Sequence, residues 1–447
     1  MSLRSRAPWV ALPAVLTLVV GASAAGNASG RSSDDPAPGT DASASAVTYD
    51  LLLRRGHVID PKNNRDRVMD IAVKNGKIAA VGSKIDPSRA KQTVDVKGNY
   101  LTPGLIDMHT HLFRGPEDAY SNGVLGLPPD GFTFRSGVTT ALDTGSAGWE
   151  NFELFKKNII DTSKTRVLSL LNIVGKGMAG GDKEQDLDNM NAAEAAKVAK
   201  KYPEIVRGIK TAHYDGPSWA PVERSVEAGE IAGIPAMIDF GSDSPERTIE
   251  ELLTKKLRPG DIYSHVYSGL RHELGDDGRL NPALAAGRER GVLFDVGHGG
   301  GSFDWNVAME GKKEGFWPDT ISTDLHVTSM NAGMKDMSNV MSKFLTMDMP
   351  LKDVIEASTW KPAQALGRKD LGNLSVGSPA DIAVFDLQKG KFGYADSFGL
   401  RVDGKEKLVT ELTVRAGEVV WDLNGRTAKP WKPGAVGNRT NTEHAAP

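Results

Sequence analysis

The sequence predicts an α/β fold in which eight parallel strand–helix units close into a (β/α)8 TIM-like barrel. Eight short apolar runs recur through the middle of the chain, and stretches with helical amphipathic spacing separate them. Residues suited to acid–base or metal chemistry stand near the ends of several runs, where such a barrel places its active site. The runs cover residues 104–111, 139–146, 166–174, 205–213, 234–241, 261–269, 292–300 and 320–326.

Helices are expected between these runs, where apolar residues repeat every three or four positions. The Met-rich segment near the end of the barrel region has the same spacing, which is typical of core packing rather than of a cofactor site. The predicted helices cover Ala192–Lys201, Pro221–Ala232, Pro245–Leu257, Pro282–Arg290 and Met334–Met347.

Both ends of the chain carry a different pattern, with short β-type runs separated by Gly, Asn, Asp and Pro. These runs lie between Tyr49 and Val96 and return at 381–387 and 411–423. We therefore expect one small β-sandwich built from both chain ends. The predicted organisation is a signal peptide (1–25), a flexible linker (26–46), a β-sandwich (47–100 plus 375–430), a hydrolase barrel (101–374) and a C-terminal tail (431–447).

The N-terminus has the features of a cleaved secretory signal. Arg4 and Arg6 precede an apolar run from Pro8 to about Val20, and the small residues 21–25 follow. This run is shorter than the roughly 20 residues that a membrane-spanning helix needs. We therefore expect an exported protein, periplasmic or secreted, without a stable membrane anchor.

Composition narrows the partners. The 447 residues are 39% hydrophobic and 25% charged, which is ordinary for a globular enzyme. The net charge of -3, without a long basic run, argues against nucleic acid as a partner and favours a small molecule. The chain has no cysteine, so any metal must be held by His, Asp, Glu or Lys. A homo-oligomer is compatible with all of this.

His109 and His111 end the first barrel run, and their two-residue spacing sends both side chains to one face of a strand. Alone, such a pair fits two solvated or core histidines equally well. Lys210, His265 and Asp324 stand at or near the ends of three other runs, where a barrel would bring all five residues together. This combination favours a metal site.

The segment LTPGLIDMHTH (101–111) resembles the first-strand signature of the amidohydrolase superfamily, and LGNLSVGSPADIAVFDL (371–387) is similar to the return strand of its small β-domain. The segments IKTAHY, SHVYSG, FDVGHGGGSF and STDLH resemble the amidohydrolase/deacetylase metallohydrolase branch, which is related to dihydroorotases. The resemblance covers most of the chain that follows the linker.

This resemblance implies a site for two divalent metal ions, with Zn²⁺ expected; Mn²⁺ is the alternative that the aspartate discussed below suggests. His109, His111 and Asp324 would bind the more buried ion and His265 the second, while Lys210 would bridge both as a carbamate formed with carbon dioxide. Asp324 would act first as general base and then as general acid. Without the resemblance, Lys210 would fit a barrel lysine paired with a carboxylate, and Asp324 a helix N-cap.

One position departs from the family pattern. Where two-metal members usually have a strand-five histidine, this chain has Asp239, which can ligate the second metal through oxygen or fail to ligate it. Two metal ions carry about four positive charges, and the carbamate, Asp324 and one hydroxide remove three. The sum is one positive charge with a histidine and zero with Asp239, which predicts a weaker Lewis acid.

Four further residues are candidates for substrate binding. His213 and Tyr214 follow Lys210 closely, Arg271 could pair with a substrate carboxylate, and His298 lies in a glycine-rich loop. For each of them a structural role is an equally good interpretation.

The resulting hypothesis is a metal-dependent hydrolase of non-peptide amide bonds, with an N-acyl or N-acetyl amino acid deacetylase ahead of an esterase, a cyclic-amide hydrolase or an isoaspartyl-type dipeptidase. The stretch GKGMAG (175–180) matches a dinucleotide-binding pattern, but the helix that this motif requires does not follow. A non-catalytic, exported metal- or solute-binding barrel is the alternative from another class.

Overall fold

The computed structural model describes residues 48–116, 125–239, 241 and 244–435. The predicted signal peptide and linker, and the last part of the predicted tail, lie outside these residues. Within the described ranges, no helix has the length and apolar character needed to cross a membrane.

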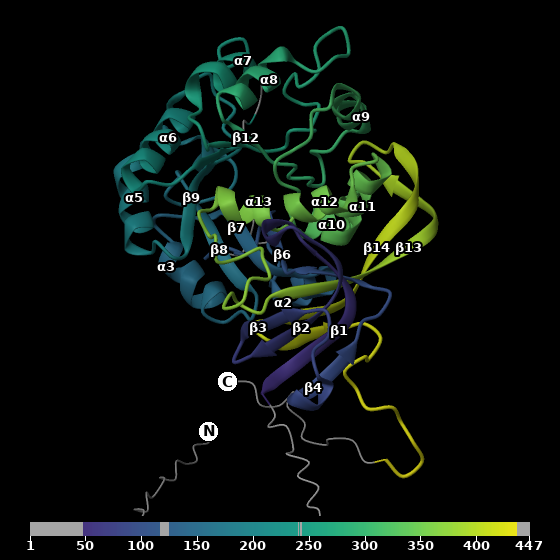
Figure 1. Ribbon diagram of the computed structural model, residues 1–447. Coiled ribbons are helices and arrows are strands. Elements are labelled where there is room, and N and C mark those ends of the chain that lie inside the picture. Colours follow the sequence, from purple (N-terminus) through teal and green to yellow (C-terminus); the bar gives the residue numbers. More distant parts are fainter. Residues whose placement is uncertain (1–47, 117–124, 240, 242–243, 436–447) are drawn as a thin grey trace, which may run out of the picture. The chain divides into compact units, whose positions relative to one another are not determined.

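Seven parallel strands form the barrel sheet, in the order β12-β11-β10-β9-β8-β7-β6 (Figure 1). The segment 320–325 completes the ring, because Thr320 bridges Asp295 beside β12 and Leu325 bridges Thr110 of β6, both in parallel. The predicted eight-membered barrel is thus confirmed, with its last member reduced to isolated bridges. The strands are β6 (Leu105–Thr110), β7 (Val138–Gly148), β8 (Arg166–Asn172), β9 (Val206–Thr211), β10 (Ala236–Ile238), β11 (Ile262–Tyr263) and β12 (Leu293–Phe294).

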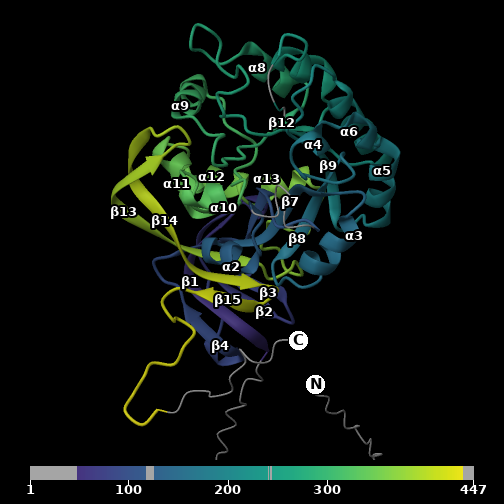
Figure 2. The same ribbon diagram turned by 180° about the vertical axis from the view of Figure 1, so that it is seen from behind.

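Helices cover the outside of the barrel, and α5 and α6 flank β8 and β9 (Figure 2). Helix α6 begins beside a proline and ends at Gly233, whose left-handed φ of 71° suits a glycine C-cap. The main helices are α3 (Phe152–Phe155), α5 (Ala192–Lys201), α6 (Ala220–Ala232), α8 (Pro282–Glu289), α9 (Trp305–Glu314), α10 (Val327–Asn331), α11 (Met337–Thr346), α12 (Leu351–Ala357) and α13 (Trp360–Ala365); the short α2 (Asp130–Thr133) and α4 (Asp182–Gln185) lie in loops.

Two of the predicted helices begin later than expected. The segment predicted as 245–257 forms α7 (Ile249–Glu251) and a π-helical turn (Leu252–Lys256), because the Thr248 side chain caps the Glu251 amide. Helix α11 begins at Met337 for the same reason, since Asp336 accepts from the Asn339 amide. Helix α5 has the predicted bounds.

Strands from both chain ends form one continuous mixed sheet of eight strands, in the order β15-β14-β13-β5-β1-β2-β3, with β4 paired to β1. Figure 1 shows the purple N-terminal strands beside the yellow C-terminal ones. The mixed sheet has an apolar core of its own, which includes Leu53, Ile71, Leu101, Ile382 and Leu412. The strands are β1 (Tyr49–Asp60), β2 (Arg65–Lys74), β3 (Lys77–Gly82), β4 (Ala90–Asp95), β5 (Tyr100–Pro103), β13 (Ile382–Ala395), β14 (Arg401–Arg415) and β15 (Glu418–Asp422).

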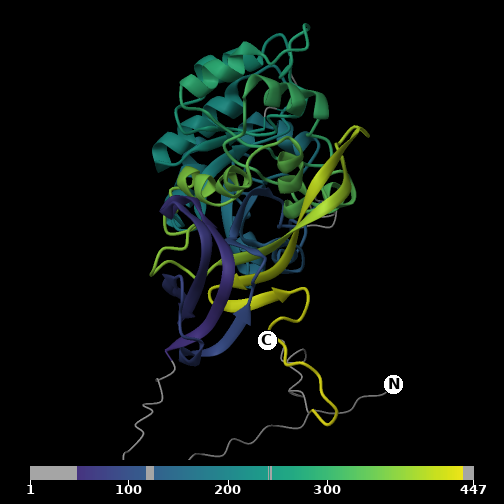
Figure 3. The ribbon, with the colours of Figure 1, turned by 45° about the vertical axis from the view of Figure 1, so that its right-hand side comes forward.

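The long β13–β14 hairpin leaves this sheet and runs to the barrel helices α9 and α11 (Figure 3). The indole of Trp305 donates to the Tyr394 carbonyl at 2.9 Å, and Lys343 Nζ donates to the Ala395 carbonyl at 2.6 Å. These bonds connect the end of β13 to helices α9 and α11.

A separate apolar cluster packs strand residues against α13. It combines Ile106, Met108, Leu142, Leu168, Leu170, Met237 and Ile262 with Ala363 and Leu366. Polar side chains gather instead at the carboxyl ends of the strands, which is where the candidate site lies.

Candidate metal centre

A pocket of about 210 Å³ opens at the carboxyl ends of the barrel strands. Its lining contains five residues predicted from sequence as metal ligands, and Lys210 lies against one of them, His109. His109 belongs to β6, Lys210 to β9 and Asp324 to the closing segment, while Asp239 and His265 follow β10 and β11. The pocket is lined by His109, His111, Leu125, Met178, His213, Asp239, His265, Arg271, Ser302, Asp324 and His326.

The ring of His109 is held in one orientation. Its Nδ1 lies 2.9 Å from Ser264 Oγ, and that hydroxyl donates to Asp295 Oδ2 at 2.9 Å. Nδ1 therefore carries the proton, and the lone pair on Nε2 faces Lys210 Nζ at 3.3 Å. Burial and the nearby Lys210 lower the pKa of His109 to about 3, so the ring is in the neutral form that binds metals.

His111 contacts Asp324 through one ring nitrogen and a serine through the other. His111 Nε2 lies 3.0 Å from Asp324 Oδ1, and the opposite ring nitrogen contacts Ser146 Oγ at 3.1 Å. Asp324 Oδ1 is buried and has no hydrogen-bond partner in the described structure. A buried carboxylate oxygen without a donor is costly unless a cation satisfies it.

Burial by itself would raise the pKa of Asp324, but the neighbouring His326 holds it well below its usual value. Asp324 is therefore an anion.

Lys210 is completely buried. Among the described residues, the hydrogen-bond partner of its Nζ is His109, and no ion pair joins it to a carboxylate. Burial lowers the pKa of Lys210, against the attraction of Asp239 and Asp324. The neutral amine is the form that can add carbon dioxide.

Asp239 is shared between two sides of the pocket. Its Oδ1 accepts from Arg271 Nη2 at 2.7 Å, while Oδ2 lies 3.2 Å from His265 Nε2 and 3.6 Å from His213 Nε2. Burial would raise the pKa of Asp239, yet His265 and Arg271 hold it well below its usual range. Arg271, weighed from sequence as a ligand for a substrate carboxylate, thus contacts an aspartate of the pocket itself.

The donor set fits metal ions. The ligand atoms of His109, His265 and Asp324 all lie within 4.8 Å of one another and are all buried. His265, whose Nδ1 donates to the Gly297 carbonyl at 2.6 Å, presents an unprotonated Nε2 to the pocket. The Nε2 lone pairs of His109 and His265 and the carboxylate of Asp324 are thus directed to the same place, where a cation can bind all three.

Three pocket residues have left-handed backbone conformations that only glycine adopts readily: His213 (φ 58°), His265 (φ 62°) and Asp324 (φ 50°). Such strained residues persist where the surroundings hold them, and they concentrate at functional sites.

The other two candidate substrate residues lie outside the pocket lining. The Tyr214 ring lies against Arg247, and its carbonyl accepts from that guanidinium at 2.8 Å. His298 is fully buried, stacks on Phe303 with ring centroids 4.5 Å apart, and contacts Lys343 through Nε2. Both side chains therefore contact other residues of the protein and do not line the pocket in which a substrate would bind.

Sequence reasoning missed His326 and Glu184. His326 lines the pocket, and its Nε2 lies 3.6 Å from Asp324 Oδ2. Its two-residue spacing from Asp324 is the same signal that drew attention to His109 and His111. Glu184, which contacts His213 Nδ1 at 2.9 Å, comes from a short loop helix that carries no such signal.

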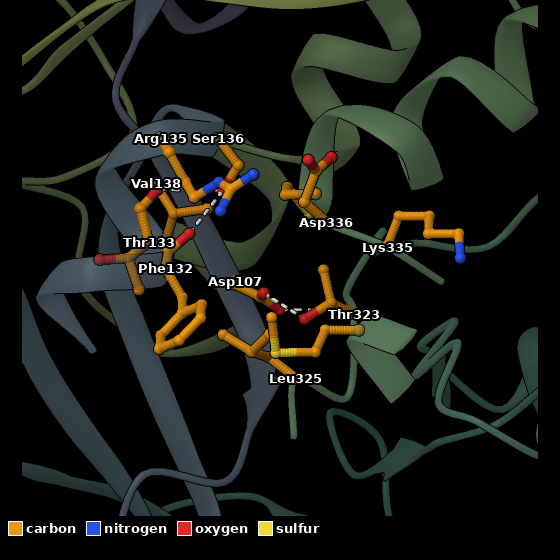
Figure 4. Close-up of a pocket in the computed structure, with 12 residues that line it drawn as sticks. Asp107, Phe132, Thr133, Arg135, Ser136, Val138, Thr323, Leu325, Lys335 and Asp336 are labelled. Carbon is orange, nitrogen blue, oxygen red and sulfur yellow. Dashed lines mark hydrogen bonds between the residues drawn. The ribbon is translucent and has the colours of Figure 1, made fainter. Parts of the chain in front are cut away.

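Asp107 and Thr323 line a second, smaller cavity of about 160 Å³ (Figure 4). Thr323 donates to both Asp107 oxygens, from its amide at 3.0 Å and from its hydroxyl at 2.5 Å. Asp107 thereby fixes the residue that precedes Asp324.

This fold and this site define a class: a barrel hydrolase whose active site lies at the strand ends and suits divalent metal ions. Residues 304–420 match the amidohydrolase family. The chain is 34% identical over 335 residues to Deacetylase Atu3266 of Agrobacterium fabrum, covering 73% of this chain and 80% of that protein. It is 30% identical over 383 residues to a deacetylase of Enterococcus faecalis, covering 83% and 99%.

Solved structures agree. An adenine deaminase has a TM-score of 0.76 at 29% identity, covering 84% of this chain and 100% of that one. A dihydroorotase has a TM-score of 0.73 at 30% identity, covering 83% and 99%. The chain belongs to the amidohydrolase family and is a hydrolase that acts on carbon–nitrogen bonds. Members of this superfamily generally use divalent metal ions, and the cluster of His109, His265 and Asp324 suits one.

Proposed function

We propose that the protein is an exported deacetylase that hydrolyses the amide bond of N-acyl or N-acetyl amino acids at a two-metal site. The observation that carries this proposal is the convergence of two imidazole nitrogens on the buried Oδ1 of Asp324, with His111 Nε2 at 3.0 Å and His109 Nε2 at 3.7 Å. Two relatives named deacetylases, at 34% and 30% identity, support the substrate class.

We assign ligand roles to His109, His111, Asp324, His265 and Asp239. When bound, two divalent ions, Zn²⁺ or alternatively Mn²⁺, would lower the pKa of a water molecule and polarise the substrate carbonyl. Lys210 would bridge them as a carbamate, formed when its neutral Nζ attacks carbon dioxide and releases one proton.

Asp324 would move the protons. As an anion, it accepts the proton of the attacking water on a carboxylate oxygen and then donates it to the leaving amine, so the carboxylate is restored at the end of the cycle. His326 also lines the pocket, and its Nε2 lies 3.6 Å from Asp324 Oδ2. Met178 and Leu125 supply apolar lining.

The test combines metal analysis with a substrate panel. The mature wild-type protein should contain about two metal ions per chain and hydrolyse N-acetyl amino acids of one hand. The Asp324→Asn variant should lose at least about a thousandfold in kcat, whereas Asp277→Asn, in an exposed loop, should retain wild-type turnover. Chelation should abolish activity, and added Zn²⁺ should restore it.

The same panel separates the alternatives. Esters, cyclic amides, isoaspartyl dipeptides and adenine, the last suggested by the adenine deaminase structure, each represent one of them. Turnover of one of these classes without any N-acyl amino acid hydrolysis would overturn the deacetylase assignment. No turnover on the whole panel, with intact metal binding, would favour the non-catalytic alternative.

Export would follow from residues 1–25. N-terminal sequencing of the protein recovered from its producing cells should find a start near residue 26.

A further inference from the structure

His213 lies between two carboxylates at the rim of the pocket. Its Nδ1 is 2.9 Å from Glu184 Oε2 and its Nε2 is 3.6 Å from Asp239 Oδ2. We propose that His213 is a ligand of the second metal ion. It follows β9, the fourth barrel strand, and supplies the imidazole that is missing after β10, the fifth barrel strand, where the chain has Asp239. This inference rests on the metal site of the proposed function.

The first argument is the orientation of the ring. Glu184 is buried, and its other oxygen, Oε1, accepts from the Gly180 amide at 2.8 Å. Its Oε2 is thus placed to accept the proton of His213 Nδ1, which leaves the lone pair on Nε2. A carboxylate that holds the far side of an imidazole in this way is the usual support of a metal-binding histidine.

The second argument is the convergence of lone pairs. The Nδ1 proton of His265 is given to the Gly297 carbonyl, so its Nε2 is also unprotonated, and it lies 3.2 Å from the same Asp239 Oδ2 that faces His213. When both imidazoles are neutral, three electron-rich atoms therefore meet at this point, an arrangement that a cation would relieve. The separations of 3.2 and 3.6 Å bracket the ligand–ligand distance of about 3.3 Å around tetrahedral zinc.

The third argument is the backbone. His213 adopts a φ of 58°, and the short helix α4 holds it there. Gln185 Nε2 donates to the His213 carbonyl at 2.6 Å, and Gln185 Oε1 accepts from the Asp215 amide at 2.9 Å. Strain held by dedicated bonds indicates that the position of this side chain matters.

His213 stands at the rim of the site. It lies outside the compact group of His109, His265 and Asp324, and its side chain is 51% exposed. Asp239 links it to that group, because Asp239 Oδ2 lies 3.6 Å from His213 Nε2 and 3.2 Å from His265 Nε2. Arg271 occupies the other oxygen of Asp239 and leaves Oδ2 to face both imidazoles.

The test is the metal content of full-length variants, which does not depend on knowing the substrate. His213→Asn is suitable because asparagine tolerates a positive φ. His272→Asn is the matched control, since His272 has a φ of 56° and is exposed. Circular dichroism establishes that each variant is folded.

We expect His213→Asn to bind the second ion at least about tenfold more weakly, and Glu184→Gln about tenfold more weakly, while His272→Asn matches the wild type. X-ray absorption of the zinc-loaded proteins should show fewer imidazole ligands per metal in His213→Asn alone. Retention of both ions with wild-type affinity and imidazole count in His213→Asn, even with a raised KM, would overturn the inference and make His213 a substrate contact.

The outcomes are separable from those of the proposed function. A wild type that binds two ions and depends on His213 for the second, but hydrolyses no amide, would overturn the deacetylase proposal and leave this inference standing. If the wild type hydrolyses N-acyl amino acids and His213→Asn keeps its full metal content, the deacetylase proposal stands and this inference is overturned.

Discussion

The guanidinium of Arg271 and the carboxylate of Asp239 form a buried ion pair, with Nη2 2.7 Å from Oδ1. The other guanidinium nitrogens donate to the Gly241 carbonyl at 3.0 Å and to Ser268 Oγ at 3.2 Å, and the Arg271 amide donates to Glu273 Oε2 at 3.0 Å. The loop after β11 thus holds the aspartate that follows β10.

This pair changes the charge count of the proposed site. Two metal ions, a carbamate, Asp324, a hydroxide and Asp239 sum to zero, and Arg271 returns the total to one positive charge. That total is the one expected for a histidine at the strand-five position. Asp239 and Arg271 together therefore act electrostatically as a neutral ligand would.

Removing the guanidinium should weaken catalysis without emptying the site. We expect Arg271→Gln to lower kcat about 10- to 100-fold, because an uncompensated Asp239 makes the metal centre a weaker Lewis acid, while metal content is retained. Steady-state kinetics and elemental analysis measure the two effects. Arg279→Gln, at a side chain 67% exposed, is the control. If KM rises only for substrates with a free carboxylate and kcat is unchanged, Arg271 binds substrate instead.

Lys210 should carry carbon dioxide. The Lys210→Met variant keeps the length of the side chain but cannot form a carbamate, so we expect it to lose metal ions and at least about a thousandfold in kcat. Nuclear magnetic resonance of wild type prepared with ¹³C-bicarbonate should show a carbamate signal that is absent from the variant. Wild-type metal content in Lys210→Met would contradict a bridging role.

Strand ends were the predictable part of this site. The two-residue spacing of His109 and His111, and the placement of Lys210, Asp239 and Asp324 at the ends of apolar runs, follow from the periodicity of a barrel strand. The structure brings these residues together at one pocket, with Lys210 behind His109, because the segment 320–325 closes the ring against β6 and β12. The β-type runs at both chain ends likewise predicted one shared β-domain, which the structure forms as a single mixed sheet.

The partners of these residues could not be predicted. Glu184 reaches His213 from a loop helix, and Arg271 reaches Asp239 from 32 positions away, so neither contact has a local sequence signal. The delayed starts of two helices were similarly hidden, because Thr248 and Asp336 act as caps only once the chain before them has turned away.

Glycine is required beside Lys210. Gly145 has a φ of 83°, and a Cβ there would lie 2.7 Å from Lys210 Cγ. Gly145→Ala should therefore displace the lysine, lower activity at least about tenfold and destabilise the fold by about 1–3 kcal/mol. Gly98→Ala is the matched control, because Gly98 has a similar φ of 86° and its Cβ would meet no atom within 4 Å. Equal activity of the two variants would show that Lys210 tolerates the shift.

Lys343 should stabilise the packing of α11 against the end of β13. It is fully buried, and its Nζ donates to His298 Nε2, to the Gly333 carbonyl at 2.9 Å and to the Ala395 carbonyl at 2.6 Å. Lys343→Met should destabilise the protein by about 2 kcal/mol at neutral pH, since it leaves buried acceptors without donors. Urea unfolding measures this, with Lys313→Met, at an exposed side chain, as the control. Equal unfolding midpoints for the two variants would contradict this role.

The same lysine predicts how stability depends on pH. Burial, only partly opposed by Asp396, lowers the pKa of Lys343 to about 7, whereas an unfolded lysine has a pKa of about 10.4. Between these values the unfolded chain binds more protons, so the contribution of Lys343 to the free energy of unfolding rises with pH. From pH 7 to pH 9 the wild type should gain about 2 kcal/mol relative to Lys343→Met. Urea unfolding of both proteins at the two pH values measures the difference, and parallel curves would mean that Lys343 stays charged in the folded protein.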